Sequence, residues 1–194
     1  MNIEYEATFP NIDKDQIRTK LKDVGAKLEK EEFLQKRIAF HTPDRQEKSW
    51  LRIRDEGDKI TMSYKTVEDN YNIEGQKEAC LQVDDLSEAE RFLQQLGCTK
   101  KAYQESKREL WKIDDVEICI DEWPHLEPFL EIESDSEDKV KKVSDKLELD
   151  YTQALFGGVD VLYAHKYNIS TDIINNRTKR ITFADKNPFI NLSK

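Results

Sequence analysis

The alternation of apolar and polar residues predicts strands along most of the chain. Residues 3–9 alternate with period two, so a strand there has one apolar face and one face carrying Glu4, Glu6 and Thr8. The same alternation recurs in the segments 33–40, 50–54, 59–66, 76–83, 105–112, 116–122 and 127–133. Turns and short loops join most of these segments, which favours antiparallel pairing, and eight such strands can close into a barrel.

Apolar residues at helical spacing interrupt the strands. Asp13 predicts the N-cap of a first helix, Ser87–Glu90 predicts a capping box at the start of a second, and Ser136 predicts the cap of a third. A further short helix is expected within 151–167. The simplest function of these helices is to cover the outside of the sheet.

These elements together predict an α+β fold, an eight-stranded antiparallel β-barrel with helices packed outside. We expect this domain to occupy residues 1–167, with polar loops at 43–49 and 67–75. Residues 168–194 are mostly polar and predict a C-terminal tail that packs on the outside or frays.

Composition limits the binding partners and the cellular location that we expect for the protein. The 194 residues carry a net charge of -9, which argues against general binding to nucleic acid or to an anionic membrane. No apolar run approaches the roughly 20 residues that span a bilayer, and the chain enters its first strand at once, which predicts no signal peptide. Cys80, Cys98 and Cys119 are widely spaced and predict reduced thiols, so we expect a cytoplasmic protein. The oligomeric state stays open, a homodimer included.

The polar faces of the predicted strands are charged on one strand after another. A single charged face usually meets water, but its recurrence on nearly every strand predicts a shared lumen. The acidic side chains on these faces are Glu4, Glu6, Glu78, Glu117, Asp121, Glu131 and Glu133. The basic side chains are Arg37, Arg52, Arg54, Lys65 and Arg108. Arginines bind phosphate oxygens, and carboxylates hold Mg²⁺ or Mn²⁺ that bridge to phosphates, so this lumen predicts a polyphosphate ligand.

The order of these motifs resembles the CYTH, or triphosphate tunnel metalloenzyme, superfamily over roughly residues 1–165. The family begins with a Glu-x-Glu strand, found here at Glu4 and Glu6, and its Leu-Arg-Ile-Arg motif is intact at 51–54. Its closing Glu-Ile-Glu motif falls at 131–133. The resemblance implies an eight-stranded antiparallel tunnel that acts on a triphosphate.

The resemblance also implies a role for each charged residue. One or two Mg²⁺ or Mn²⁺ ions would be held by Glu4, Glu6, Asp121, Glu131 and Glu133. The triphosphate would be bound by Arg37, Arg52, Arg54, Lys65 and Arg108. Glu78 and Lys65 are the expected catalytic residues, Glu78 by orienting basic side chains or by adding to metal binding. The substrate would be ATP, thiamine triphosphate or inorganic triphosphate, in a class IV adenylyl cyclase-like reaction or in hydrolysis.

One position departs from the family pattern in a way that bears on activity. Thr8 stands where the family has a lysine that helps to activate or position water. Ser106 likewise replaces a second lysine of the family, so the carboxylate half of the expected site matches the family better than the basic half. This departure favours an alternative function, a non-catalytic protein that binds triphosphate or polyphosphate.

Overall fold

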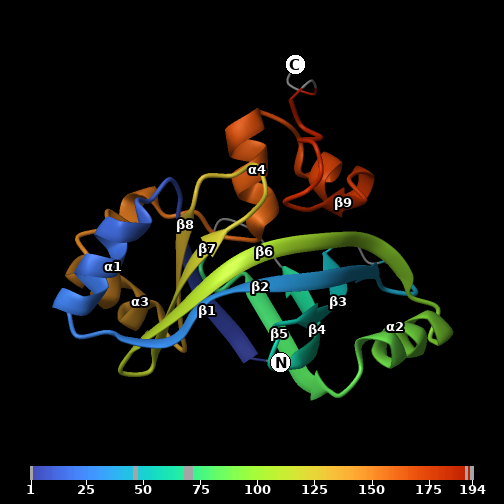
Figure 1. Cartoon of the computed structure of the whole chain (residues 1–194), viewed down its shortest axis with the longest axis horizontal. Helices are drawn as coiled ribbons and strands as arrows, with labels where there is room; N and C mark the ends of the chain where they lie inside the picture. The colour runs from blue at the N-terminus through green and yellow to red at the C-terminus, as the bar shows by residue number, and fades with distance from the viewer. Residues whose placement is uncertain (1, 46–47, 68–71, 191, 193–194) are drawn as a thin grey trace.

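The computed structural model describes residues 2–45, 48–67, 72–190 and 192 (Figure 1). Within these residues, eight strands form a closed antiparallel barrel in the order β2-β3-β4-β5-β1-β8-β7-β6, and pairing between β6 and β2 closes it. The barrel strands are β1 (Asn2–Phe9), β2 (Lys27–His41), β3 (Ser49–Asp55), β4 (Ile60–Val67), β5 (Gln76–Val83), β6 (Thr99–Ile113), β7 (Val116–Glu122) and β8 (Phe129–Ser134). The predicted α+β barrel is confirmed. Parts of the two predicted loops, residues 46–47 and 68–71, lie outside the described residues.

Strands β2 and β6 are longer than the sequence pattern indicates. Each has 15 residues, whereas the alternation predicted only 33–40 and 105–112. Their pairing shifts register three times, twice before Phe33 and once after Ala39. Each irregularity interrupts the period of two, because an extra residue on one strand turns the following side chains to the other face. The ends of these strands are therefore hidden from a reading of the sequence alone.

Helices α1 (Lys14–Asp23) and α3 (Glu137–Lys146) lie side by side over one flank of the barrel (Figure 1), and α3 packs against β1 and β8. The predicted cap of α1 is confirmed, since the Asp13 side chain accepts a hydrogen bond from the backbone N–H of Asp15 at 2.9 Å. Ser136 precedes α3 as predicted, but its side chain makes no capping hydrogen bond.

The capping box predicted at Ser87–Glu90 is wrong. Helix α2 (Leu86–Gln95) starts earlier, and its N-cap is Asp85, whose carboxylate accepts from the backbone N–H of Glu88 at 2.7 Å. The earlier start places Leu86 inside the helix, where it packs against the apolar cluster that joins α2 to the barrel. Tertiary packing therefore selected one capping residue over a similar one two positions later.

The apolar faces of the strands point outward, beneath the helices. Ala7 and Phe9 of β1 pack with Leu21 of α1 and Val140 of α3 in one core cluster. The same strand turns its carboxylates to the inside of the barrel, where they line a cavity. The core of this protein therefore lies between the barrel wall and its helices, and the lumen is polar.

The C-terminal segment packs against β6 (Figure 1). Helix α4 (Val159–Tyr167) is followed by the π-helical turn η2 (Ile173–Arg177) and by β9 (Arg180–Ile181), which pairs in parallel with β6. Phe189 is fully buried in a second core cluster with Tyr163 and Trp123. The described part of 168–194 is thus a packed element, because it carries apolar side chains of its own.

Two further observations concern membrane-spanning helices and the cysteines. No helix in the part of the chain that the structure describes is long and apolar enough to cross a membrane. The three cysteines are free, with Cys98 and Cys119 buried and Cys80 exposed.

Candidate active site

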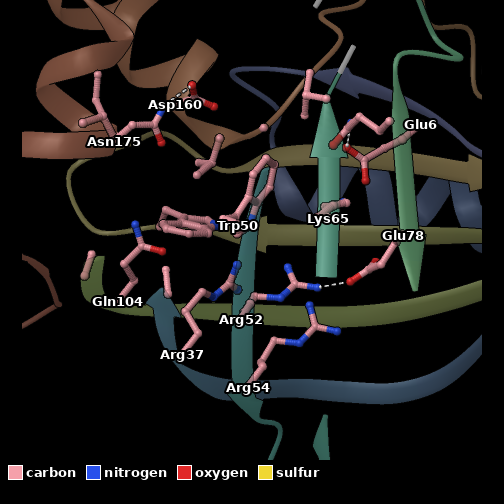
Figure 2. Close-up of a pocket in the computed structure, with 18 of the residues that line it drawn as sticks. Glu6, Arg37, Trp50, Arg52, Arg54, Lys65, Glu78, Gln104, Asp160 and Asn175 are labelled. Atoms are coloured by element: carbon pink, nitrogen blue, oxygen red, sulfur yellow. Dashed lines mark hydrogen bonds and ion pairs between the residues drawn. The ribbon is translucent and has the colours of Figure 1, made fainter. Parts of the chain in front are cut away.

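A cavity of about 780 Å³ occupies the barrel (Figure 2). Its volume lies in the range of roughly 300–1,000 Å³ that is common for small-molecule sites. The cavity brings together all the residues that the sequence predicted for the site: Glu4, Glu6, Arg37, Arg52, Arg54, Lys65, Glu78, Arg108, Asp121, Glu131 and Glu133. Their roles stay predictions, but their location in one lumen is a property of the fold.

Acidic and basic side chains occupy opposite halves of the barrel wall. The neighbouring strands β5, β1, β8 and β7 carry its acidic lining residues, and the remaining strands β6, β2, β3 and β4 carry its basic ones. Charges of one sign gathered on one wall create a strong local potential. The basic half suits anionic groups of a ligand, and the acidic half suits cations.

Ion pairs join the two halves of the wall where β4 and β5 adjoin. Lys65 Nζ of β4 lies 2.8 Å from Glu4 Oε2 of β1, and Arg52 Nη2 donates to Glu78 Oε1 at 2.9 Å (Figure 2). Burial raises the pKa of Glu78, but the hydrogen bond with Glu4 and the charge of Arg52 outweigh it, so that its pKa is lowered. Glu78 is therefore ionised at neutral pH and suited to orienting Arg52.

Arg108 makes the densest of these pairings. Its Nη2 lies 2.5 Å from both Asp121 Oδ2 and Glu131 Oε2, and its Nε donates to Asp121 Oδ1 at 2.8 Å. Burial lowers the pKa of Arg108, but the charge of Asp121 outweighs burial and holds it well above its usual range. This guanidinium is permanently charged and bridges β6 to β7 and β8.

A row of glutamates crosses the acidic half. Glu133 of β8 is directly paired with Glu6 of β1 on one side and with Glu117 of β7 on the other. Like charges directly opposite one another repel. Burial, followed by the charge of Glu6, raises the pKa of Glu133 to about 7, and burial with a hydrogen bond to Glu78 raises the pKa of Glu4 to about 8. A divalent cation would relieve this repulsion, so the donor types fit a hard metal ion.

The carboxylates do not yet converge on a metal position. Within the described residues, no three His, Cys, Asp or Glu side chains lie close enough together to hold a metal ion. The reason is visible in the pairing, since Lys65 holds Glu4, and Arg108 holds Glu131 and Asp121. Metal binding here requires these carboxylates to exchange a basic side chain for the ion.

Arg37 differs from the other arginines of the lumen. It is 7% exposed, and its Nη2 donates to Gln35 Oε1 at 2.7 Å and to Ser106 Oγ at 2.6 Å. Its guanidinium lies 4.4 Å from the ring centroid of Trp123. Among the described residues it has no carboxylate partner, and its buried Nε has no acceptor. Burial and the charges of neighbouring arginines lower its pKa well below the usual range.

Glu56 does not line the cavity, but it is the partner of the lining residue Arg54. The sequence analysis missed this role because Glu56 fell in a segment typical of a hairpin turn. Arg54 Nε donates to its Oε1 at 2.8 Å, and its side chain is only 8% exposed. The turn is possible because Gly57 has φ +86, a conformation that favours glycine. The spacing of Arg54 and Glu56 at the strand end was the only available signal.

Thr8, the position that departs from the family pattern, is 1% exposed. Its backbone is bridged to Leu155, with Thr8 N donating to Leu155 O at 3.0 Å and Leu155 N donating back at 2.9 Å. Thr8 is not part of the cavity lining. The segment between α3 and α4 therefore contacts β1 at this position through its backbone.

The cavity also has lining residues that the sequence analysis did not assign to the site. Among them are Trp50, Lys101, Gln104, Asp160 and Asn175. These five come from β3, β6, α4 and η2. No periodic pattern links them, because segments far apart in the chain bring them together.

A closed antiparallel barrel whose lumen is divided into a carboxylate half and an arginine half defines a class of protein. The family model of the CYTH domain matches residues 2–160 of this chain. The protein belongs to the CYTH family.

Comparisons with individual proteins agree with this assignment. "Putative adenylate cyclase MJ0240" from Methanocaldococcus jannaschii is 29% identical over 153 residues, which cover 76% of this chain and 87% of that protein. The PH1012 protein from Pyrococcus horikoshii OT3 matches with a TM-score of 0.65 and 22% identity, over 79% of this chain and 94% of that one. "Putative adenylyl cyclase HpAC1" from Hippeastrum, described as having a dominant triphosphatase activity, matches with a TM-score of 0.57 and 15% identity, over 88% and 97%. At these identities the solved structures share the fold.

Proposed function

We propose that this protein is a metal-dependent enzyme that converts a triphosphate-containing molecule held inside the barrel. The observation that carries the proposal is Arg37, a buried guanidinium in the cavity wall with no carboxylate partner among the described residues. A buried charge without a counter-charge is costly. An anionic ligand is the natural partner of such a group, and its Nε–H is free to donate to one.

The basic half of the lumen suits a chain of phosphates. Arg52 and Arg54 project from the same face of β3, and Arg37 lies directly opposite Arg54 on β2. Three guanidinium groups on neighbouring strands offer paired N–H donors, the geometry that binds phosphate oxygens bidentately. We assign these arginines, together with Lys65 and Arg108, to the triphosphate.

The acidic half suits the metal that such a ligand brings with it. Mg²⁺ or Mn²⁺ would be held by Glu4, Glu6, Asp121, Glu131 and Glu133, and when bound it would neutralise charge on the phosphate oxygens. Binding of both then exchanges partners within the lumen. Lys65 and Arg108 release their carboxylates and donate to phosphate oxygens instead.

Two reactions would use the same phosphate-binding and metal-binding residues. In an adenylyl cyclase-like reaction the ribose 3′-oxygen bonds to the α-phosphorus, the bond from that phosphorus to the bridging oxygen breaks, and pyrophosphate leaves. In hydrolysis a water oxygen bonds to the terminal phosphorus, the bond from that phosphorus to its bridging oxygen breaks, and phosphate leaves. Membership of the CYTH family, with one relative named as a cyclase and one described as a triphosphatase, supports both. We assign Lys65 to the reacting phosphate and Glu78 to orienting Arg52, as catalytic and positioning residues.

The threonine at position 8 favours one other function. Because the residue there is not a lysine, β1 offers no ammonium group to position an attacking water. A protein that keeps the phosphate-binding and metal-binding residues but lacks such a group would bind triphosphate without converting it.

The test is a screen of purified protein with ATP, thiamine triphosphate and inorganic triphosphate, with and without Mg²⁺ or Mn²⁺. Phosphate, pyrophosphate and cyclic nucleotide are measured separately, and calorimetry measures binding. We expect metal-dependent release of one of these products, and Arg37→Gln should weaken triphosphate binding by about tenfold or more. The matched control is Arg91→Gln on α2, an exposed arginine outside the cavity.

The outcomes separate the two functions. Product release identifies an enzyme, and the product distinguishes cyclase from hydrolase. Tight binding with no product from any substrate would select the binding protein. Absence of both binding and turnover, with Glu4→Gln changing neither, would refute the assignment of the lumen to triphosphates.

A further inference from the structure

Arg37 is held in the barrel wall by three uncharged side chains. Its Nη2 donates to Gln35 Oε1 at 2.7 Å and to Ser106 Oγ at 2.6 Å. The Ser106 hydroxyl in turn donates to Gln35 Oε1 at 3.1 Å, and the ring of Trp123 lies against the guanidinium. Gln35 of β2 is directly paired with Ser106 of β6, so the two strands together build this set of contacts.

Gln35 and Ser106 do not reach the cavity themselves. Their side chains are buried, with Gln35 1% exposed and Ser106 0% exposed. Neither residue lines the cavity, whereas Arg37 does. Any effect of these two residues on a bound ligand must therefore pass through Arg37.

The hydrogen bonds fix the orientation of all three side chains. A hydroxyl offers one donor and two acceptor positions, and an amide oxygen offers two acceptor positions. Ser106 can therefore accept from Arg37 while it donates to Gln35, and Gln35 Oε1 accepts from both. A reversed amide would bring its NH₂ group against Arg37 Nη2, donor against donor. The guanidinium is thus held through Nη2, and among the described residues its Nε–H has no acceptor.

The three other arginines of the lumen are each paired with a carboxylate. Figure 2 shows one such pair, between Arg52 and Glu78. A phosphate that binds one of those arginines competes with its carboxylate. At Arg37 it competes only with neutral hydrogen bonds, which are weaker than charge-assisted ones. The uncharged partners therefore leave the full charge of Arg37 available to an anion.

Position 106 has to be small and uncharged for this arrangement. A lysine at this position would place its ammonium group against the Arg37 guanidinium, and two buried cations in contact repel strongly. The serine leaves room for the guanidinium to reach from β2 to β6. The residues at positions 37 and 106 therefore depend on each other.

We propose that Ser106 and Gln35 are positioning residues for phosphate binding, which hold the Arg37 guanidinium in place without a counter-charge. The inference rests on the proposed triphosphate function and deepens it, because it names the residues that make Arg37 available to the ligand. Loss of the Ser106 hydroxyl should weaken triphosphate binding only while Arg37 is present. A carboxylate at position 35 should compete with the ligand for Arg37.

The experiment measures the affinity of inorganic triphosphate by calorimetry with Mg²⁺, together with thermal melts. Ser106→Ala should weaken binding about tenfold, because a hydrogen bond to a charged group is lost. In an Arg37→Gln background the same substitution should change the affinity by less than about twofold. The matched control is Ser144→Ala, which removes a fully buried serine hydroxyl from α3, outside the cavity, and should bind triphosphate like the wild type.

A second variant decides the matter if Ser106→Ala folds poorly. Gln35→Glu keeps the shape of the side chain and gives Arg37 a carboxylate partner. It should bind triphosphate about tenfold more weakly or worse, while its Tm is equal to or above that of the wild type. A residue with a purely structural role would not combine weaker binding with an undiminished Tm.

Each other outcome counts against a stated part. Unchanged triphosphate affinity in Ser106→Ala or in Gln35→Glu would refute the inference and leave the proposed function standing. An equal loss from Ser106→Ala in the wild type and in Arg37→Gln would also refute it, because the hydroxyl would then act without Arg37. Absence of triphosphate binding by the wild type would refute the proposed function, and the inference with it.

Discussion

The pair between Arg54 and Glu56 provides a sharp test of the lumen, because it predicts opposite effects on stability and on ligand binding. In Glu56→Gln the side chain keeps its shape and one oxygen, but Arg54 loses its counter-charge. Removing one partner of a buried pair costs about 3–5 kcal/mol. The lower end applies here, because the amide oxygen still accepts the 2.8 Å hydrogen bond from Arg54 Nε and the pair borders a cavity.

A loss of about 3 kcal/mol corresponds to a decrease in Tm of roughly 6–12 °C for a chain of this size. Inorganic triphosphate should then restore more stability to Glu56→Gln than to the wild type, for two reasons. The phosphates replace the missing counter-charge of Arg54, and they no longer meet the negative charge of Glu56. Thermal melts with and without inorganic triphosphate, in metal-free buffer, measure both effects.

The matched control is Asp58→Asn in the same hairpin, where the carboxylate is 64% exposed and pairs with Lys30. We expect its melt to differ little from that of the wild type. An unchanged Tm in Glu56→Gln would show that the pair contributes no stability. An equal ligand-induced shift in Glu56→Gln and the wild type would show that Arg54 does not contact phosphate, and the assignment of Arg54 would be wrong.

Three further predictions concern pH, metal and the position that departs from the family. Burial raises the pKa of Glu56, but the charge of Arg54 outweighs it and holds the pKa below the ordinary value of 4.5. The stabilisation is therefore complete above that value and lost as pH falls through the lower folded-state pKa, so the melts of the wild type and Glu56→Gln should converge in acid. A constant difference between them down to pH 3, about one unit below the ordinary value, would contradict this. Glu6→Gln should weaken Mn²⁺ binding about tenfold or more in calorimetry without lowering metal-free triphosphate binding; equal Mn²⁺ affinity would remove Glu6 from the ligand set. Thr8→Lys should lower Tm, because Thr8 is only 1% exposed and a longer side chain must displace its neighbours, and an unchanged Tm would show that this position tolerates the longer side chain.

Much of the barrel could be predicted from the local alternation of apolar and polar residues. Strand alternation placed Glu4 and Glu6 on one face and Arg52 and Arg54 on another, and the recurrence of charge on successive strands predicted that these faces share a lumen. Period two is a property of each strand by itself, so it survives whatever the strand pairs with. The register shifts in β2 and β6 broke that period, and there the predicted strands were too short.

The ion pairs could not be predicted from the sequence in the same way. Nothing in the sequence links Lys65 to Glu4, or Arg108 to both Asp121 and Glu131, because these contacts depend on the order in which strands close the barrel. Likewise, only the structure shows that Arg37 has no carboxylate partner among the described residues, because this depends on which carboxylates pair with the other arginines.

The sequence by itself determined the strands, the inward charge and the family, because side-chain alternation and motif order are recorded residue by residue. Tertiary structure alone decided which carboxylate each cation meets, that Glu56 pairs with Arg54, and that the C-terminal segment brings Asn175 to Asp160 in the cavity wall. These features arise from barrel closure and from the packing of the C-terminal core, which join residues far apart in the chain. No local sequence pattern therefore predicts the contact between Asn175 and Asp160.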